Sequence, residues 1–342
     1  MLRRLLPPLL VVLLVAGCGG SKSSSGTATA TAGSAKRIKV GLVTDINQLN
    51  DRGFNHLAYL GLLRAEKRLG ITGRVYQSAS AQDYIPNLAQ FAKLHYDLVI
   101  SVGFAQADAV AKVAKRFPST HFAIIDVDAT TLAGKPKNVL GLLFREQEVG
   151  YLAGYLAGLV EKQKPGPDVI GSVGGMKEPP VDRFIAGYQA GARKADPGIK
   201  LLNAYSHDWV DLAKCKEAAL SQIASGSSIE FQVAGGCGLG TLDAAKEKGV
   251  WGIGVDADQS FLGSQILTSA TKHVDQAVYL TIQDVLSGKF RGGRNAVFGL
   301  KDNGVGLGSI SPRVPKADVT KLDKIRAQIA NGSLGGIPTT VS

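Results

Sequence analysis

The sequence predicts an α/β protein built from two similar halves, each with a parallel β-sheet. Its 342 residues exceed what one hydrophobic core usually takes, and 45% hydrophobic with 20% charged residues is an ordinary globular balance. Aromatic residues reach only 6% whereas glycine contributes 42 residues, which suits many strand–helix units with tight turns better than an all-β sandwich. This composition excludes disordered and collagen-like chains.

In the first half, short β-rich runs alternate with segments of helical periodicity. Ala58, Leu62, Ala65 and Leu69 recur at helical spacing and form one apolar stripe. Strand, helix and strand in this order predict right-handed βαβ units and a parallel sheet covered on both faces. The expected strands are 38–44, 74–77, 97–101, 121–125 and 138–144, and the other expected helices are 84–94 and 105–116.

The same alternation continues in the second half. Its first helix carries Gly150, Gly154 and Gly158 at every fourth position and is too short to span a membrane, so we expect it to pack closely on a sheet. Two similar halves in succession predict a protein with two lobes. The expected strands are 169–173, 199–205, 229–234 and 251–256, and the expected helices are 147–160, 181–195, 212–224 and 241–248.

The N-terminus has the pattern of a lipoprotein signal peptide. Arg3 and Arg4 precede an apolar run at 5–16, which is far shorter than the roughly 20 residues of a membrane-spanning helix. Small residues then lead to Cys18, which resembles a bacterial lipobox, so we expect cleavage after residue 17 and lipidation of Cys18. A plain secretory signal is the alternative. The Gly/Ser/Thr-rich segment that follows predicts a tether over 18–36.

The net charge is +11, and removing Arg3 and Arg4 with the signal peptide lowers it to +9. The basic residues are scattered through amphipathic segments, without a basic run or an aromatic-interleaved strand motif. We therefore expect no nucleic-acid partner. Solvated faces and attraction to an anionic membrane or cell wall explain the charge better.

The residues directly after the expected strands form one chemically coherent set. In open parallel sheets, ligands bind beyond the carboxyl ends of the strands, so these positions should meet at one cleft. They combine acidic side chains with bare backbone, which predicts a binding site. They are Asp45, Gly103, Asp126, Gly174, Gly175, Gly235, Gly236 and Asp256.

No motif in the sequence indicates catalysis, a metal or a cofactor. The glycines at 236–240 follow a strand, but their spacing is GxGxG rather than the GxGxxG of dinucleotide-binding turns. There is no Walker lysine, no GxSxG and no HExxH, and the five histidines lack metal-ligand spacing. We therefore expect a binding protein rather than an enzyme.

Cys215 and Cys237 are the two thiols that remain once Cys18 is lipidated. Cys215 falls in the first turn of an expected helix and Cys237 follows the next strand, so both lie at the same edge of the sheet. A disulfide is geometrically allowed in an extracytoplasmic protein, and two free thiols are the alternative.

Several segments in the same order resemble the basic membrane protein family, whose lipoproteins are substrate-binding components of ABC transporters and best known as purine nucleoside receptors. The resemblance covers nearly all of residues 37–338. It is carried by VTD at 43–45, NDRGFN at 50–55, YDLVI at 96–100, FAIID at 122–126, YLAGYLAG at 151–158, WGIGVDADQ at 251–259, and LTS at 267–269 with Lys272.

This resemblance implies the type I periplasmic-binding-protein fold: two Rossmann-like lobes joined by three crossings, with the ligand between them. Lobe 1 would comprise 37–145 plus 270–298, and lobe 2 would comprise 146–269 plus 299–342. The crossings are expected near 144–148, 267–272 and 299–308, and a helix at 274–286 would return to lobe 1.

The resemblance also implies roles for individual residues. Phe54 and Trp209 would sandwich the base, and stacking contributes roughly 1–3 kcal/mol per base. Asp256 would accept hydrogen bonds from the ribose diol, and Lys272 would donate to a ribose hydroxyl. The remaining ligand-binding residues would be Asp45, Asn55, Asp126, Gly235 and Gly236.

Simpler structural roles remain open at this point. The three aspartates could cap helices, Phe54 could belong to the core, and Lys272 could be a solvated residue at a helix start. Two departures from the family pattern are visible. Gly53 stands where many relatives carry a polar side chain, and the stretch 207–209 (HDW) replaces a more typical small-small-Phe stretch.

The sequence therefore predicts a monomeric, lipid-anchored, extracytoplasmic binding protein that delivers a nucleoside, with purines favoured, to a membrane permease. A ligand-sensing receptor component without a transport role is one alternative. A binding protein for another ring-bearing solute is the other.

Overall fold

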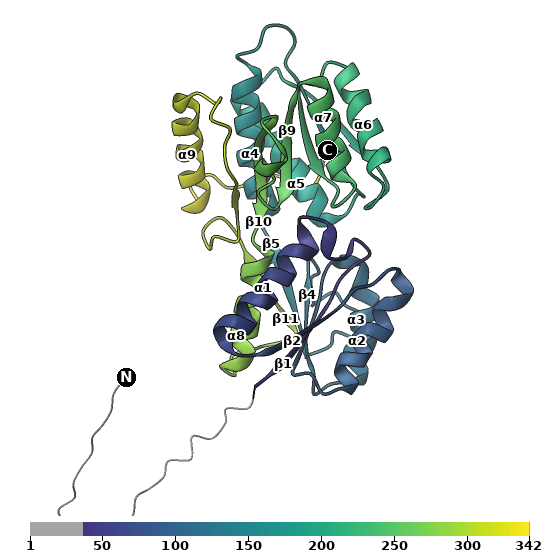
Figure 1. The fold of residues 1–342 in the computed structure, drawn as a ribbon. Coiled ribbons are helices and arrows are strands. Elements are labelled where there is room, and N and C mark those ends of the chain that lie inside the picture. Colours follow the sequence, from purple (N-terminus) through teal and green to yellow (C-terminus); the bar gives the residue numbers. More distant parts are fainter. Residues whose placement is uncertain (1–36, 342) are drawn as a thin grey trace, which may run out of the picture. The chain divides into compact units, whose positions relative to one another are not determined.

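The computed structural model describes residues 37–341, which form one compact unit from Arg37 onward. The predicted signal peptide, the tether and Cys18 lie outside the described residues. Two six-stranded sheets, each flanked by helices, make up this unit (Figure 1). This confirms the predicted α/β fold with two lobes. None of the helices within 37–341 is long and apolar enough to cross a bilayer.

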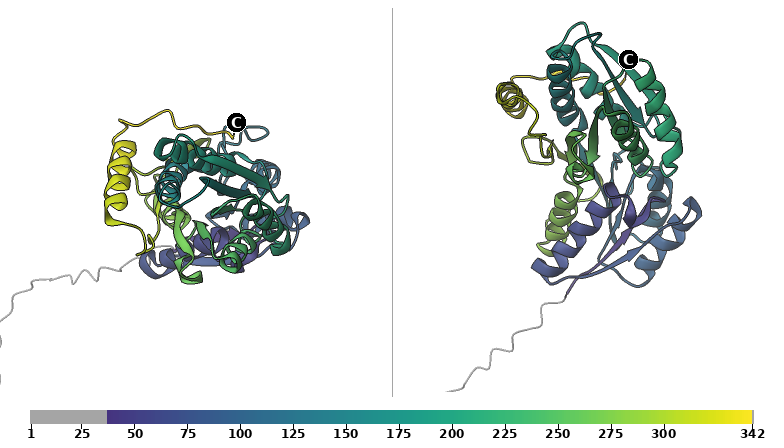
Figure 2. Two further views of the ribbon diagram at one scale, coloured as in Figure 1. Left: turned by 90° about the horizontal axis from the view of Figure 1, so that it is seen from above. Right: turned by 45° about the horizontal axis from the view of Figure 1, so that its top comes forward.

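Lobe 1, as we define it, is the first sheet with its helices, and all its strands are parallel. The helices α1 and α8, far apart in the sequence, lie side by side on one face (Figures 1 and 2), and α2 and α3 cover the other. The strands, in spatial order, are β11 (Arg294–Phe298), β5 (Val139–Phe144), β4 (His121–Ile125), β3 (Leu98–Ser101), β1 (Lys39–Val43) and β2 (Thr72–Tyr76). The helices are α1 (Phe54–Leu69), α2 (Tyr84–Lys93), α3 (Ala107–Arg116) and α8 (Val274–Leu286).

Lobe 2 is the second sheet with its helices. Its last strand runs antiparallel to its neighbour, whereas we expected parallel pairing throughout. The strands, in spatial order, are β12 (Val305–Leu307), β10 (Ile266–Lys272), β9 (Trp251–Asp256), β8 (Ile229–Val233), β6 (Val169–Gly174) and β7 (Lys200–Tyr205). The helices are α4 (Glu146–Glu161), α5 (Pro179–Ala195), α6 (Leu212–Ala224), α7 (Gly238–Lys248) and α9 (Lys316–Ala330). The described residues also contain four 3₁₀ turns, three in lobe 1 and one in lobe 2. They are η1 (Gln48–Asn50), η2 (Ala81–Asp83) and η3 (Phe104–Gln106) in lobe 1, and η4 (Ser260–Leu262) in lobe 2.

The chain passes between the two sheets three times. It leaves lobe 1 after β5, returns after β10, and leaves again after β11. Residues 270–272, which we assigned to lobe 1, belong to β10 in the sheet of lobe 2, because Ala270 and Thr271 pair with both β9 and β12. The second crossing therefore begins at the end of β10, directly after Lys272.

The glycines of α4 set the distance to its neighbouring helix. A Cβ added at Gly150, Gly154 or Gly158 would collide with a backbone carbonyl of α5, at Phe184, Tyr188 or Ala192 respectively. We expected these glycines to pack closely on a sheet. They face the helix α5 instead, so the predicted packing partner was wrong. Small residues at this spacing let two helix backbones approach closely.

Replacing Gly154 with alanine should destabilise the protein, because the added methyl group would overlap the Tyr188 carbonyl and force the two helices apart. We expect the free energy of unfolding to fall by about 1–3 kcal/mol, as for other overpacked cores. Urea denaturation measures this. The control is Gly335→Ala, where no atom lies within 4 Å of the added Cβ. Equal stability of the two variants would contradict the packing argument.

Candidate functional site

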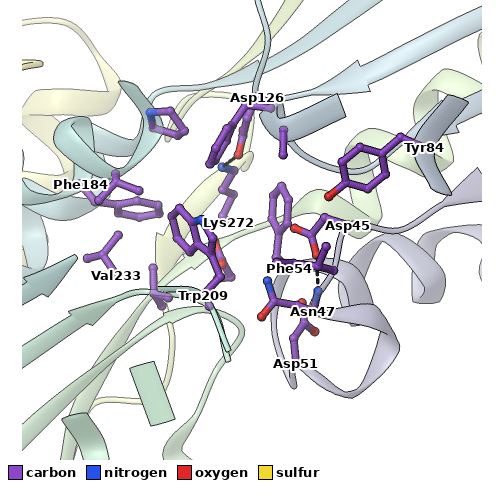
Figure 3. Close-up of a pocket in the computed structure, with 18 residues that line it drawn as sticks. Asp45, Asn47, Asp51, Phe54, Tyr84, Asp126, Phe184, Trp209, Val233 and Lys272 are labelled. Atoms are coloured by element: carbon purple, nitrogen blue, oxygen red, sulfur yellow. Dashed lines mark hydrogen bonds and ion pairs between the residues drawn. The ribbon is translucent and has the colours of Figure 1, made fainter. Parts of the chain in front are cut away.

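A pocket lies between the lobes at the carboxyl ends of the strands (Figure 3). Residues from both lobes line it, and most of them lie at the end of a strand, in the loop after it, or in the first turns of the next helix. Seven of our nine predicted ligand-binding residues are among them; Asn55 and Gly236 are not. The lining residues are Asp45, Ile46, Asn47, Asp51, Phe54, Tyr84, Phe104, Ala105, Asp126, Pro180, Val181, Phe184, Trp209, Val233, Gly235, Val255, Asp256 and Lys272.

Asp51, which the sequence did not single out, fixes the start of α1 beside the pocket. Its carboxylate accepts hydrogen bonds from the backbone N–H groups of Gly53 (3.0 Å), Asn55 (2.6 Å) and His56 (3.1 Å). These N–H groups have no partner inside the helix, so an acceptor at this place stabilises the first turn. Phe54, the first residue of α1, thereby gains a fixed place in the pocket wall.

Asn55 acts on the pocket from behind. It is fully buried, and its amide Nδ2 donates to Asp45 Oδ1 (2.7 Å) and to Asp51 Oδ2 (2.9 Å). Its Oδ1 accepts from the Asp45 backbone N–H at 3.1 Å. Asn55 therefore positions two pocket carboxylates instead of lining the pocket itself. Burial raises the pKa of Asp45 to about 6, and the hydrogen bonds from Asn47 and Asn55 limit that rise.

Lys272 ends β10 and carries its ammonium group into the boundary between the lobes. The side chain is only 2% exposed, which excludes a solvated residue at a helix start. Its Nζ lies 2.6 Å from Asp126 Oδ2 in lobe 1 and 3.0 Å from Glu146 Oε1 in lobe 2. Burial alone would lower the pKa of Lys272, but the carboxylates around it outweigh burial and hold that pKa above its ordinary value.

Aromatic rings enclose the same ammonium group. The Nζ of Lys272 lies 5.1 Å from the ring centroid of Phe54, 4.9 Å from that of Phe144 and 5.9 Å from that of Phe184. Such ring faces attract a cation and exclude water from it. Figure 3 shows Phe54, Phe184 and Trp209 grouped around Lys272.

Two acids of lobe 2, Asp256 and Glu146, lie near the Lys272–Asp126 pair. Burial raises the pKa of Asp256 to about 7 and that of Glu146 to about 7, and in both cases Lys272 opposes the rise. Glu146 is fully buried and also faces Arg183 NH1 at 3.5 Å, so it lies behind the pocket wall. Asp256 lines the pocket directly.

Asp126 and Asp256 adopt the left-handed backbone conformation, with φ of 67° and 62°. This conformation strains the backbone of a non-glycine residue, and residues strained in this way concentrate at functional sites. Asp126 directly follows β4 and Asp256 is the last residue of β9, which are the fourth strands of their sheets along the chain. Oδ1 of Asp126 is buried and has no hydrogen-bond partner within the described part of the chain, so it is free to accept one from a ligand.

The aromatic wall is larger than the sequence indicated. Trp209 packs on Gly175, where any Cβ would collide with the indole, and its ring lies 5.7 Å from that of Phe104 in lobe 1. Sequence reasoning missed Phe104 and Phe184, which begin or enter helices without any motif around them. The Gly103 that precedes Phe104 was flagged and was the available signal.

Of the HDW stretch at 207–209, two residues lie outside the pocket. His207 is exposed, and neither His207 nor Asp208 lines the pocket. Asp208 instead accepts from the backbone N–H groups of Val210 and Asp211 and pairs with Lys214, and these hydrogen bonds hold its pKa well below the ordinary range. Only the tryptophan of this stretch contributes to the pocket wall.

A disulfide joins Cys215 of α6 to Cys237, whose Cα atoms lie 5.6 Å apart. It lies beside the glycine turn that reaches the pocket, since the Cys237 N–H donates to the carbonyl of Trp209. Gly235 adopts a φ of 55° and lines the pocket, whereas Gly236 donates its N–H to Asn47 Oδ1 of lobe 1 at 3.4 Å. A Cβ added at Gly238 or Gly240 would collide with Gln232 or with the Leu212 carbonyl, so close packing within the protein explains these two glycines.

The chemistry of this pocket is recognition. Its charged lining groups are four aspartates and one lysine, which favours a neutral or cationic ligand over an anionic one. Flat rings, carboxylates and one ammonium donor suit a ligand with an aromatic face and vicinal hydroxyl groups. Within 37–341 no group of histidine, cysteine or acidic side chains is arranged to hold a metal ion.

Replacing Lys272 with methionine should destabilise the protein more at pH 8 than at pH 5. Loss of the cation raises the folded-state pKa values of Glu146 and Asp256 further above their unfolded values. The folded state then binds protons that the unfolded state has lost, so stability falls as pH rises through this range. We expect a loss of about 3–5 kcal/mol at pH 8, measured by denaturation at both pH values.

Lys272→Arg, which keeps the charge, is the control and should lose less. An equal loss at pH 5 and pH 8 in Lys272→Met would show that the cation does not stabilise these carboxylates.

Comparisons with known proteins agree with this geometry. A family model described as "ABC transporter substrate-binding protein PnrA-like" matches residues 38–335. The chain is 35% identical over 320 residues to the "ABC transporter nucleoside-binding protein BmpA" of Lactococcus lactis subsp. cremoris, covering 87% of this chain and 88% of that one. It is 33% identical to the "CD4+ T-cell-stimulating antigen" of Listeria monocytogenes, with 88% of each chain covered.

Solved structures give the same fold. An ABC transporter solute-binding protein from Aeropyrum pernix aligns with a TM-score of 0.79 and 28% identity, over 88% of this chain and 94% of that one. A solute-binding protein from Conexibacter woesei aligns with a TM-score of 0.70 and 27% identity, over 89% and 100%. Both are named as solute-binding proteins of ABC transporters, and the predicted periplasmic-binding-protein fold is confirmed. The chain belongs to the PnrA-like family of ABC transporter substrate-binding proteins.

Proposed function

We propose that this protein binds a nucleoside, with purines favoured, between its two lobes and delivers it to the permease of an ABC transporter. It would act as a monomer outside the cytoplasm, anchored to the membrane by a lipid on Cys18. The observation that carries the proposal is one pocket that combines aromatic rings from both lobes with Asp126, Asp256 and Lys272. Family membership supports the substrate-binding role, and the lining of the pocket supports the ligand class.

The aromatic rings fit a nucleobase. Phe54 and Phe104 come from lobe 1, and Trp209 and Phe184 come from lobe 2, so a flat ligand can contact rings of both lobes at once. Each stacked ring contributes roughly 1–3 kcal/mol and is tolerant of base identity. A ligand held this way would stabilise the closed arrangement of the lobes, as in other hinge-closing binding proteins.

The charged groups fit a ribose. A carboxylate accepts hydrogen bonds from both hydroxyl groups of a diol, and Asp256 lines the pocket with its carboxyl group. The unpaired Oδ1 of Asp126 is a second acceptor, and Lys272 is the single cationic donor. The excess of acids disfavours a phosphate, so the proposal is a nucleoside and not a nucleotide.

The relatives support the ligand and the location. The Lactococcus protein is named as nucleoside-binding, and three Pyrococcus relatives, 32–37% identical to this chain, are named as lipoproteins. The N-terminal sequence up to Cys18 fits the same location, because a basic start, a short apolar run and a cysteine after small residues are the pattern of an exported lipoprotein.

Calorimetry with adenosine, guanosine, inosine, uridine and cytidine tests the ligand class, with AMP as the anionic control. We expect binding of at least one purine nucleoside and no binding of AMP, because its phosphate would enter a pocket with four aspartates. No binding of any nucleoside would reject the proposal. Tighter binding of AMP than of adenosine would reject the ribose assignment.

Asp256→Ala and Trp209→Ala should each weaken nucleoside binding, the first through the ribose and the second through the base. We expect a loss of about 2–3 kcal/mol for Asp256→Ala, as for a hydrogen-bonded charged group, and about 1–3 kcal/mol for Trp209→Ala. The matched controls are Asp243→Ala and Val210→Ala, both on exposed residues outside the pocket. Nearly unchanged affinity in both pocket variants would show that the ligand binds elsewhere.

Nucleoside affinity should decrease as pH falls below 7. Asp256 accepts the diol only when ionised, and its pKa lies at about 7, so the dissociation constant should rise up to about tenfold per pH unit below that value. Glu146 is one of the charges that raise the pKa of Asp256. In Glu146→Gln the midpoint of the pH profile should therefore shift to lower pH.

Glu148→Gln is the control, because Glu148 lies on the same helix turn but bonds to the Leu300 N–H and to Arg145 instead of Lys272. Calorimetry from pH 5 to pH 8 measures both variants. An identical shift in the two, or a flat profile in the parent protein, would contradict the assignment of Asp256.

A further inference from the structure

The basic residues of lobe 1 gather at the edge of its sheet opposite the pocket. All strands of this sheet are parallel, so their first residues lie at one edge, and the helices that precede them end there. The last turns of α1, α2 and α3 carry Lys67, Arg68, Lys93, Lys115 and Arg116. We call this the basic edge.

A surface groove at the basic edge extends the same charge. It is formed where β4, β5 and β11 begin, and its charged lining side chains are Lys115, Lys137 and Arg291, with no acid among them. All three are exposed. Among the acids of this edge, Asp97 accepts a hydrogen bond from the backbone N–H of Lys39, Glu66 accepts one from that of Gly73, and Asp284 lies half-buried in the last turn of α8.

Helix dipoles alone do not account for this concentration. Basic residues near helix C-termini are favourable in any helix, so the second lobe should show the same pattern. In lobe 2, α4 and α6 carry no basic residue in their last turns, whereas α5 carries Arg193 and Lys194 and α7 carries Lys246 and Lys248, of which Lys248 pairs with Glu247. The helix ends alone therefore do not distinguish the two lobes, and the additional charge of lobe 1 comes from loop residues. Lys137 and Arg291 of the basic edge lie in loops, where no helix dipole favours them.

The basic edge is also where the chain enters the fold. Arg37 lies two residues before the start of β1 at this edge, and Cys18 lies nineteen residues earlier in the sequence. Nineteen residues span at most about 65 Å even when fully extended. A lipid on Cys18 would therefore hold the domain within this distance of the bilayer, with the attachment at the basic edge.

We propose that the basic edge of lobe 1 binds the anionic surface of the membrane bilayer. The proposal rests on the proposed lipid anchor for its location, but the affinity belongs to the folded domain itself. Each basic residue near an anionic lipid surface contributes about a fivefold gain in affinity, so a cluster of this size binds without any pocket for a headgroup. In this pose the nucleoside pocket faces away from the bilayer.

Vesicle sedimentation tests the proposal on the chain from residue 18 onward. Cys18→Ser is introduced so that no lipid can be attached at this position. Vesicles of phosphatidylcholine alone are compared with vesicles that also contain phosphatidylglycerol, at low and high salt. We expect binding only to the anionic vesicles, and its loss at high salt. Neutralising three exposed residues of the basic edge in K115Q/R116Q/K137Q should weaken binding roughly a hundredfold.

The control R193Q/K194Q/K246Q removes the same charge from exposed positions of lobe 2 and should retain most of the affinity. Equal loss in both variants would overturn the proposal, since net charge alone would then explain binding. Binding to soluble polyphosphate but not to vesicles would overturn it in favour of a wall polymer. Nucleoside calorimetry on both variants distinguishes a failure of the membrane proposal from a failure of the nucleoside proposal. None of the substituted residues lines the pocket, so nucleoside binding should be unchanged in both.

Discussion

The organisation of this protein depends on one buried cation. Lys272 lies at the end of β10, its ammonium group pairs with Asp126 of lobe 1 and Glu146 of lobe 2, and it is almost fully buried. A buried charge costs several kcal/mol unless it is paired, so these carboxylates must stay where they are for the lobes to meet as they do. The position of lobe 1 relative to lobe 2 is thereby tied to the protonation of a few acids, and the proposed ligand would bind beside them.

That arrangement explains why so many acids surround the proposed ligand site. Asp126 and Glu146 neutralise Lys272, whereas Asp256 lines the pocket with a pKa raised to about 7 by burial. A diol that donates two hydrogen bonds to Asp256 would stabilise its ionised form and lower that pKa. Ligand binding and proton release are then coupled, and the coupling passes through Lys272 to the contact between the lobes.

Much of the fold could be predicted from the sequence because parallel strands are buried on both faces and appear as apolar runs. The stretch 121–125 was predicted at its observed bounds, and Asp126 followed from the rule on strand ends. Glu146 and Phe184 were not found this way, because each belongs to a helix. They come near the site because α4 and α5 pack against each other. The short antiparallel strand β12 contains only three residues and leaves no periodic pattern.

The two lobes are related in design, and the difference between them is what makes a site. Along the chain β4 and β9 are the fourth strands of their sheets; Asp126 directly follows β4 and Asp256 ends β9, and both have a left-handed backbone. The fifth strands differ: β5 ends in Phe144, whereas β10 ends in Lys272. Lys272 thus pairs with Asp126, Asp256 lines the same pocket, and the ring of Phe144 lies 4.9 Å from the Lys272 Nζ. A lysine at both positions would place two ammonium groups together, and two phenylalanines would leave the acids unpaired. β5 and β10 each lead directly into a crossing between the lobes. Because only β10 ends in a lysine, the acids of the pocket face one cation, and that cation lies where the chain passes from one lobe to the other.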